Sequence, residues 1–530
     1  MDQRYVNRIQ NGSLEINNNR SLESIDYLSN MNIQKLMIKN CFNIIPKLTG
    51  NIKELSLIMC FVKNIDDLQL ILEKLNIQSN QLMSIDNIER FQNLKSLNIS
   101  SNKFVDIKFI QYLQQIRELN ISHNKIKDIS ILVNLRNLRE LDISSNEGVD
   151  TKPLHTMQLL THLNLAFCGI QDISILKSLA NLVELDITDS KGLHLYQLEN
   201  QQKLTKICLQ YTQTVDLKFL YQFKDLKELN ISNNKGIDLS TLKYFVQLTK
   251  VQLQENQLQN TLCLSKLENL EYLDISLNKY IDLISLRNLS KIKHLNLRNC
   301  NLRSISDLKD LVELEELDIS NNENIDISQL QYLTKLICLK SNNNQLDNIQ
   351  TLKYLVKLKE LELSGNIGID ITPLQYLINL QILQLSYCKL DDISALRPLH
   401  NLENINIQIN SIVYISPIQE MTNLTQARLD CNKVVDLQAI LNHQYFDQFS
   451  IGSQEKPTLQ EKYFANKLRA IDTTTTQLRQ IRIQHQLQQS VKYSLNLNIS
   501  WNIQKLTNNL LVLTNNVVTV FQSMFSTYIE

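Results

Sequence analysis

The chain has 530 residues, and its 54 Lys and Arg residues balance 54 Asp and Glu residues, so the formal net charge is zero. This balance excludes the broad positive field that draws proteins to nucleic acid, and the sequence has no apolar run of about 18 residues that would span a membrane. Nine Gly and six Pro are few for this length, which favours one short unit repeated many times over several domains joined by linkers.

The first residues of the chain precede the repeats. They lack the charged-then-apolar pattern of a secretory signal peptide, so we expect a cytoplasmic protein. Residues 1–13 are mostly polar. We expect them to form a helical cap on the first repeat, because the terminal unit of a repeat array needs a polar cover.

A six-residue motif, Leu-x-Ile-Ser-x-Asn, begins at Leu119 and at Leu141 and recurs along the chain. If the first apolar residue marks each repeat, every step from Leu75 to Phe449 is 22 residues long. The only shorter steps, of 19 and 20 residues, lie between Leu36 and Leu75. The series has 21 positions, which start at Leu14, and it predicts a solenoid over residues 14–455.

The spacing within one repeat predicts how it folds. In Leu-x-Leu both leucines point to one face of a short strand and the residue between them points to the other. Further apolar residues bring the chain back across the core, and in the repeat that starts at Leu163 these are Ile170, Ile173, Leu176, Leu179 and Leu182. Stacked repeats then bury one continuous core, which no single repeat encloses alone.

The fifth residue after each marker is never apolar from Leu75 onward. It is Asn in most repeats and Cys in three of them, Cys168, Cys300 and Cys388. We expect this short side chain to satisfy backbone groups where the strand turns into the core. Cysteines several repeats apart are too distant for a disulfide, and only Cys41 and Cys60, in adjacent repeats, are near enough to pair.

The pattern LxxLxLxxNxIxxIxxLxxL resembles the 22-residue class of leucine-rich repeats. That class includes cytosolic phosphatase regulators and internalin-type bacterial adhesins, and the chain also resembles multi-copy protist families. The resemblance implies an α/β solenoid, a horseshoe with a parallel β-sheet on the concave face and short 3-10 or α segments on the convex face. The fold serves many partners, so the resemblance alone names none.

The repeats alternate, so the structural unit is a pair of 44 residues. One class carries glycine in its loop, at Gly148, Gly192, Gly236 and Gly368, which predicts a tight turn with positive φ. The aspartates that follow, Asp238, Asp282, Asp326 and Asp370, are predicted to cap a short helix on the convex side. A calcium site is the alternative, but the clustered carboxylates of calcium loops are missing.

Two columns of residues flank the core leucines on the strand face. In the column before the marker, acids alternate with Lys or His, for example Glu140, His162, Glu184 and Lys206, which predicts a ladder of cross-strand ion pairs. The column between the two leucines is mainly acidic. Its charged residues in the middle repeats are Asp142, Asp186, Asp274, Asp318 and Glu362, with Lys340 as the single base.

This acidic strip predicts attraction of a basic partner, and a merely solvated face is the alternative. Three aromatic residues, Phe167, Tyr211 and Tyr387, follow their strands at equivalent positions. Exposed aromatic residues are favoured binding anchors, although they would also fit against the loop. We therefore take the three aromatic residues and the charged strip as the candidate partner-binding residues.

The 22-residue register stops near Lys456, and residues 456–530 are predicted to form a helical tail. From Ile499 to Met524 apolar residues follow a 3-4 spacing, which is typical of a coiled-coil seam. This seam predicts either self-association through residues 499–524 or a hairpin with the preceding helix.

The sequence contains no Gly-rich phosphate loop, no paired metal-ligand histidines and no nucleophile motif. We therefore expect no enzyme activity, no cofactor and no metal. The leading hypothesis is a protein–protein interaction scaffold that binds its partner on the concave face. A regulatory subunit of an enzyme such as a protein phosphatase, and a cell-surface or host-contact adhesin, are the alternatives.

Overall fold

The structure is a computed structural model that describes residues 9–17, 25–41, 47–258, 260–279, 281–435, 440, 443 and 449–450. The chain divides into two compact units, Met1–Leu346 and Asp347–Glu530, and each is described by itself. Most of the predicted N-terminal cap, residues 1–8, and the predicted tail with its seam at 499–524 lie outside the described residues.

In the first unit each repeat contributes one strand to a parallel sheet, and the marker residues lie opposite one another. Leu141, for example, pairs with Leu163, and Leu163 pairs with Leu185. The predicted strand positions and their register are therefore confirmed. The strands of this sheet are β1 (Ser13–Asn17), β2 (Lys35–Lys39), β4 (Glu54–Ile58), β6 (Lys74–Asn76), β7 (Ser96–Asn98), β8 (Glu118–Asn120), β9 (Glu140–Asp142), β10 (His162–Asn164), β11 (Glu184–Asp186), β12 (Lys206–Cys208), β13 (Glu228–Asn230), β14 (Lys250–Gln252), β15 (Tyr272–Asp274), β16 (His294–Asn296), β17 (Glu316–Asp318) and β18 (Cys338–Lys340).

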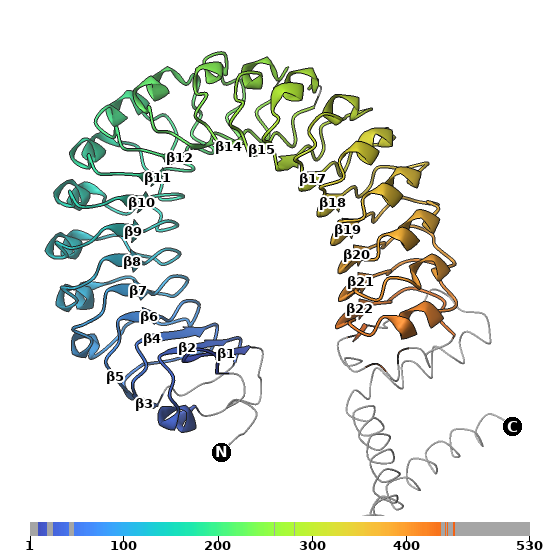
Figure 1. Cartoon of the computed structure of the whole chain (residues 1–530). Helices are drawn as coiled ribbons and strands as arrows, with labels where there is room; N and C mark the ends of the chain where they lie inside the picture. The colour runs from blue at the N-terminus through green and yellow to red at the C-terminus, as the bar shows by residue number, and fades with distance from the viewer. Residues whose placement is uncertain are drawn as a thin grey trace, which may run out of the picture. The chain divides into compact units, whose positions relative to one another are not determined.

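The opposite side of the first unit carries short helices, all of them 3-10 helices. Figure 1 shows the strands on the inner side of the curved stack and these helices on its outer side. They are η1 (Asp26–Asn30), η2 (Ile88–Arg90), η3 (Lys108–Tyr112), η4 (Ser130–Asn134), η5 (Lys152–Thr156), η6 (Ser174–Ser178), η7 (Leu195–Leu198), η8 (Lys218–Gln222), η9 (Leu242–Tyr244), η10 (Leu262–Leu264), η11 (Ile284–Asn288), η12 (Ser306–Leu308) and η13 (Ser328–Tyr332).

The second unit continues the same architecture. Its parallel strands are β19 (Glu360–Glu362), β20 (Ile382–Gln384), β21 (Asn404–Asn406), β22 (Gln426–Arg428) and β23 (Phe449–Ser450), and its 3-10 helices are η14 (Gln350–Tyr354), η15 (Thr372–Tyr376), η16 (Ser394–Leu396) and η17 (Ser416–Glu420). The marker residues again face one another, with Ala427 opposite Phe449 at the end of the predicted series.

The two short steps keep the register of the sheet, because Leu55 lies opposite both Leu36 and Leu75. On the outer side of these repeats two strands, β3 (Leu48–Gly50) and β5 (Leu68–Leu70), pair with each other in place of 3-10 helices. Gly50 has φ +107° and a Cβ there would lie 2.9 Å from the Ser29 carbonyl oxygen, so only glycine fits. Residues 9–13 form a turn and a β-bridge rather than the predicted helix.

The predicted core is buried, including all five return residues of the repeat at Leu163. Above that core runs a ladder of buried asparagines, of which Asn278 is typical. Its Nδ2 donates to the carbonyl oxygens of Leu253 at 2.9 Å and Ile275 at 2.9 Å. Its Oδ1 accepts the backbone N–H of Asn256 at 3.0 Å and of Leu258 at 3.1 Å. One side chain thus satisfies buried backbone groups of two repeats.

Cys168 and Cys388 replace asparagine in this ladder after repeats whose loops carry glycine, at Gly148 and Gly368, whereas Asn256 follows the loop with Gly236. The Cys168 thiol donates to the Ile143 carbonyl oxygen at 3.2 Å, but a thiol is a weak acceptor for the preceding loop. The loop N–H of Gly148 instead reaches the backbone oxygen of Cys168 at 2.8 Å. Gly148 has φ +70°, which confirms the predicted turn. Gly368 N–H likewise reaches the backbone oxygen of Cys388 at 2.8 Å, so in these two repeats the loop bonds to the backbone of the next ladder residue and not to its side chain.

The Cys41 and Cys60 thiols donate to backbone carbonyl oxygens, that of Lys39 at 3.2 Å for Cys41 and that of Ile58 at 3.2 Å for Cys60. Burial raises the pKa of the Cys60 thiol to about 11. The structure therefore gives no support to a disulfide between these two residues.

The predicted aspartate caps Asp282 and Asp326 lie one residue before the N-cap position of their 3-10 helices and bond to the first backbone N–H of each helix. Asp282 and Asp326 accept the backbone N–H two residues further on, at 3.1 and 2.9 Å. Asp128, Asp172 and Asp238 make the same contact, each at 2.8 Å. This backbone hydrogen bond holds the pKa of each of the latter three carboxyl groups below its usual value.

Two substitutions in adjacent repeats test the ladder. Asn278→Cys removes the acceptor of two buried backbone N–H groups, whereas Asn256→Cys removes the acceptor of one, Asn234 N–H at 2.7 Å. Because an orphaned buried donor costs about 1–3 kcal/mol, we expect Asn278→Cys to destabilise the chain by about 2 kcal/mol more than Asn256→Cys. Urea unfolding followed by circular dichroism measures the difference, and equal midpoints would contradict the assignment.

The aspartate caps predict a pH dependence. A carboxyl group with a lowered pKa in the folded state stabilises the fold at neutral pH and loses that contribution as acid protonates it. Asn260 and Asn348 cap their helices through the same contact, at 3.1 and 2.7 Å, so asparagine preserves the bond without titrating. The triple variant Asp128→Asn, Asp172→Asn and Asp238→Asn should therefore lose less of its thermal stability than the parent between about pH 5 and pH 2. If the variant and the parent lose the same amount of thermal stability on acidification, the aspartate caps are not the source of the pH dependence.

Candidate functional site

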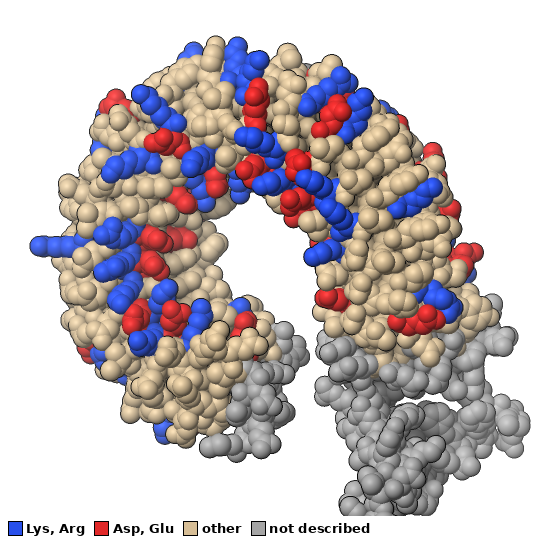
Figure 2. All heavy atoms as spheres, viewed as in Figure 1, with Lys and Arg blue, Asp and Glu red and all other residues tan. Residues whose placement is uncertain are grey.

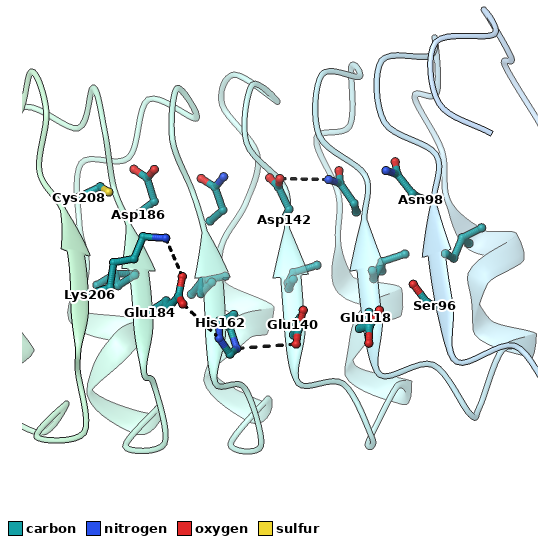
Figure 3. A pocket seen from close by; sticks show the side chains of 17 residues that line it. Ser96, Asn98, Glu118, Glu140, Asp142, His162, Glu184, Asp186, Lys206 and Cys208 are labelled. Atoms are coloured by element: carbon teal, nitrogen blue, oxygen red, sulfur yellow. Dashed lines mark hydrogen bonds and ion pairs between the residues drawn. The ribbon is translucent and has the colours of Figure 1, made fainter. Parts of the chain in front are cut away.

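A shallow hollow of about 360 Å³ lies on the inner strand face of the first unit, across β7 to β12. The two strand-face columns predicted from the sequence line it (Figure 3). Its polar lining residues are Ser96, Asn98, Glu118, Asn120, Glu140, Asp142, His162, Asn164, Glu184, Asp186, Lys206 and Cys208. Period-2 alternation places them here, because the leucines between them point into the core.

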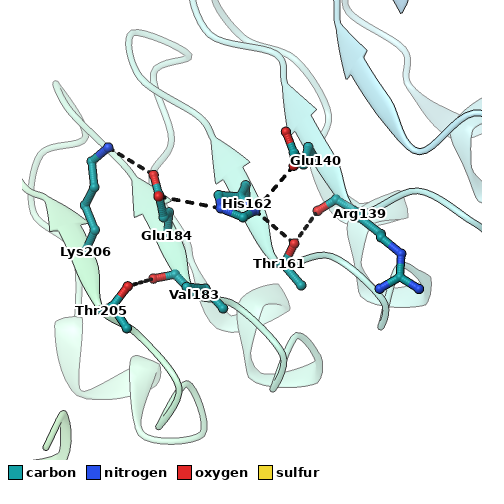
Figure 4. A network of polar contacts seen from close by, with 8 residues as sticks. All are labelled: Arg139, Glu140, Thr161, His162, Val183, Glu184, Thr205 and Lys206. Atoms are coloured by element: carbon teal, nitrogen blue, oxygen red, sulfur yellow. Dashed lines mark hydrogen bonds and ion pairs between the residues drawn. The ribbon is translucent and has the colours of Figure 1, made fainter. Parts of the chain in front are cut away.

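The column before the marker forms a connected network of polar contacts on β9 to β12 (Figure 4). His162 lies between two carboxylates, with Nε2 3.5 Å from Glu184 Oε1 and Nδ1 4.0 Å from Glu140 Oε1. Lys206 Nζ lies 3.0 Å from Glu184 Oε2, and this hydrogen bond raises the pKa of Lys206. The predicted cross-strand ladder is present here, and each exposed pair contributes under about 1 kcal/mol.

The imidazole of His162 is also held from its own strand. Thr161 Oγ1 lies 2.9 Å from His162 Nδ1 and donates to the Arg139 carbonyl oxygen at 3.1 Å. The side chain is therefore positioned by neighbours on both sides of its strand, and it links the two glutamates into one unit.

The column between the leucines is tied to the backbone. Asp142 Oδ1 accepts the N–H of Ser144 at 2.9 Å, and its Oδ2 accepts from Asn120 Nδ2 at 3.2 Å. Asp186 Oδ1 accepts the N–H of Thr188 at 2.9 Å. Asn164 makes the same turn with an amide oxygen, at 3.0 Å. An amide oxygen thus makes the same turn as a carboxylate, so this turn does not depend on the negative charge.

The charges of the hollow do not balance. Five acidic side chains and one lysine line it, and Lys206 already pairs with Glu184. Among the described residues, Glu118, Asp142 and Asp186 form no ion pair. On the side of the repeats that Figure 2 shows, which is not the strand face, many Lys and Arg side chains lie beside Asp and Glu side chains. The hollow is therefore a local negative site on a chain whose net charge is zero.

The structure corrects one predicted binding residue. Asp274 is only 3% exposed. Its Oδ2 accepts from Gln254 Nε2 at 2.6 Å and from Asn296 Nδ2 at 2.9 Å, and its Oδ1 accepts the N–H of Ser276 at 3.0 Å. The longer Gln254 side chain covers the carboxylate, so Asp274 supports the sheet instead of facing a partner.

The other charged candidates lie outside the hollow. Asp318 and Lys340 are half-buried on β17 and β18 of the first unit, and Glu362 is half-buried on β19 of the second unit. Asp318 Oδ1 accepts the N–H of Ser320 at 2.9 Å. Of the acids in the predicted strip, Asp142 and Asp186 line the hollow.

The three aromatic candidates are half-exposed and point away from the core. Phe167 and Tyr211 follow β10 and β12 in the first unit, and Tyr387 follows β20 in the second. All three have positive φ, of 57°, 58° and 60°. The backbone N–H of Phe167 bonds to the Thr188 carbonyl oxygen at 2.9 Å. None of the three lines the hollow.

Sequence reasoning treated the alternating column only as a structural ladder and missed that Glu118, Glu140 and Glu184 share a hollow with Asp142 and Asp186. The signal was available, because both columns carry acids in the same run of repeats. The burial of Asp274 could not be predicted from the sequence, because it depends on the length of the neighbouring Gln254 side chain.

Cys208 is the cysteine that lines the hollow. Burial raises its pKa to about 12, with the charge of Asp186 as a further cause, so the thiol is protonated at neutral pH and is a poor nucleophile. In the part of the chain that the structure describes, no three His, Cys, Asp or Glu residues gather as metal ligands. The helices of that part are all too short or too polar to cross a membrane.

Comparison with known proteins agrees with this repeat geometry. The family described as Leucine Rich repeats (2 copies) matches residues 114–154, and the family described as Leucine Rich repeat matches residues 156–177. No curated protein sequence matches the chain.

Among solved structures, the mouse RP105/MD-1 complex matches at 20% identity and a TM-score of 0.56, over 85% of this chain and 88% of that chain. The TLR13–ssRNA13 complex matches at 16% identity and a TM-score of 0.52, over 82% of this chain and 83% of that chain. An internalin, InlF of Listeria monocytogenes, shares 24% identity over 73% of this chain and 87% of that chain, at a TM-score of 0.35. At these identities the similarity concerns the fold alone.

Proposed function

Because this chain is a leucine-rich-repeat protein, we propose that it is a scaffold that binds a protein partner on the inner strand face of its first unit. Leucine-rich-repeat domains generally bind proteins and are typically non-catalytic. The observation that carries the proposal is the negative hollow across β7 to β12, where side chains from six adjacent strands face the solvent together. Parallel strands hold these side chains in fixed rows about 4.8 Å apart.

The chemistry of the hollow favours a partner segment that is basic and extended. Glu118, Asp142 and Asp186 keep carboxylate oxygens that no cation of the described chain neutralises. A lysine- or arginine-bearing segment that crosses the strands would meet one acid after another. Such complementarity raises the association rate more than the final affinity, and salt screens it.

Two aromatic side chains border this path. Phe167 and Tyr211 stand beyond the carboxyl ends of β10 and β12, which both contribute to the hollow. Both residues have positive φ, a backbone conformation that asparagine adopts with less strain than a residue with a half-exposed aromatic ring. We therefore assign the two rings as apolar anchors that flank the charged path.

Neutralising the hollow tests the proposal. The triple variant Glu118→Gln, Asp142→Asn and Asp186→Asn keeps each acceptor oxygen and removes each charge. We expect it to bind a partner recovered by proximity labelling about ten-fold more slowly at low salt than the parent chain. Surface plasmon resonance measures the rate. The matched control is Asp172→Asn, Asp238→Asn and Asp326→Asn, which removes three charges from the outer side and should leave the rate unchanged.

A second pair of variants separates anchors from structural residues. Asparagine occupies the positions of Phe167 and Tyr211 in other repeats, as Asn233 and Asn299 with φ of 59° and 56°. Phe167→Asn and Tyr211→Asn should therefore preserve the thermal midpoint while the dissociation rate rises by about ten-fold or more. Unchanged binding in both the acid and the aromatic variants would contradict a partner on this face.

A further inference from the structure

The second unit carries an exposed apolar surface on two neighbouring repeats. Tyr354 and Tyr376 end η14 and η15, and Val356 and Ile378 lie two residues beyond them. Their exposed fractions are 49%, 55%, 48% and 53% in that order. The intervening Leu355 and Leu377 are fully buried, so the four exposed side chains project together from the outer turns of the repeats.

Three lysines surround this surface. Lys353 lies in η14 beside Tyr354, Lys357 follows Val356 in the next turn, and Lys359 directly precedes β19, which begins with Glu360. The segments 352–359 and 374–381 contain no acidic residue. Within the described part of the second unit none of the three forms an ion pair. Lys353 Nζ lies 5.2 Å from the centre of the Tyr354 ring. We call these seven side chains the lysine–tyrosine patch.

The backbone beneath the patch is already satisfied. Asn379 Nδ2 donates to the Val356 carbonyl oxygen at 2.8 Å, and Asn401 Nδ2 donates to the Ile378 carbonyl oxygen at 2.9 Å. These carbonyls would otherwise lose water when an apolar phase covers the turn, at a considerable cost. The turns can therefore enter a poorly hydrated layer without leaving these two acceptors unpaired.

We propose that the lysine–tyrosine patch is a peripheral docking site for an anionic lipid surface. Tyrosine rings and lysine stems are amphipathic, so their apolar parts reach the acyl boundary while the hydroxyl and ammonium groups stay among the headgroups. Val356 and Ile378 supply the apolar area, and the three unpaired cations supply attraction to anionic headgroups. The chain as a whole is neutral, and this local excess of lysine is what gives the patch its preference.

The site is independent of the inner hollow, which belongs to the first unit. An acidic protein segment is the competing occupant. The lipid surface is favoured because the patch combines two tyrosines with aliphatic side chains on projecting turns, the composition that proteins place at membrane interfaces.

Vesicle co-sedimentation of the full chain tests the docking site. We expect binding to phosphatidylcholine vesicles that contain phosphatidylserine, little binding to pure phosphatidylcholine, and loss of binding at about 1 M salt, where the Debye length is about 3 Å. The variant Lys353→Gln, Lys357→Gln and Lys359→Gln should lower partitioning by about 100-fold. Val356→Ser with Ile378→Ser should lower it as well, with the thermal midpoint recorded for each variant.

The matched control is Lys224→Gln, Lys266→Gln and Lys309→Gln, three exposed lysines on the outer turns of the first unit, which should bind like the parent. An equal loss in this control would overturn the proposal, and so would an absence of vesicle binding by the parent chain. Binding that persists in the patch variant would also overturn it and would place the contact elsewhere, for example in residues 456–530, where basic residues exceed acidic ones.

Discussion

The asparagine ladder is the interaction on which the rest of the fold depends. A solenoid of short strands turns its backbone into the core in every repeat, and each turn buries donors and acceptors that water cannot reach. Asn102 meets this need with a single amide, which donates to the Ile77 and Ile99 carbonyl oxygens at 3.1 and 3.0 Å and accepts the backbone N–H of Leu82 at 2.9 Å. Unmade hydrogen bonds of this kind cost far more than made ones contribute.

Because the ladder and the leucines hold the repeats together, the strand-face side chains are left to vary. Asp142 and Asn164 make the same local turn, one with a charged and one with a neutral side chain. The fold therefore does not fix the charge of the residues on this face. The acids of the inner hollow use that freedom, and the lysines of the lysine–tyrosine patch occupy exposed positions on the outer turns. The proposed binding surfaces are therefore columns of surface residues on a repeated frame.

The fold was largely predictable from the sequence, because 22-residue spacing and period-2 alternation fix the strands and their register. The glycine turn at Gly148 and the aspartate cap at Asp238 were predictable for the same reason, since backbone geometry restricts the residue. The site was predictable only in part. The sequence placed Asp142 and Asp186 on one face and predicted the cross-strand pairing around His162, but the burial of Asp274 depends on a side-chain conformation that spacing does not encode.

Hydrogen exchange at the ladder tests the central claim most directly. Leu258 and Leu302 lie in loops after their strands, yet their backbone N–H groups bond to the amide oxygens of Asn278 and Asn322, at 3.1 and 3.0 Å. The account predicts that these two amides exchange as slowly as the strand amides of Val251 and Leu295. Exchange at the rate of exposed loop amides would contradict it, because the ladder would then not be what holds the repeats together.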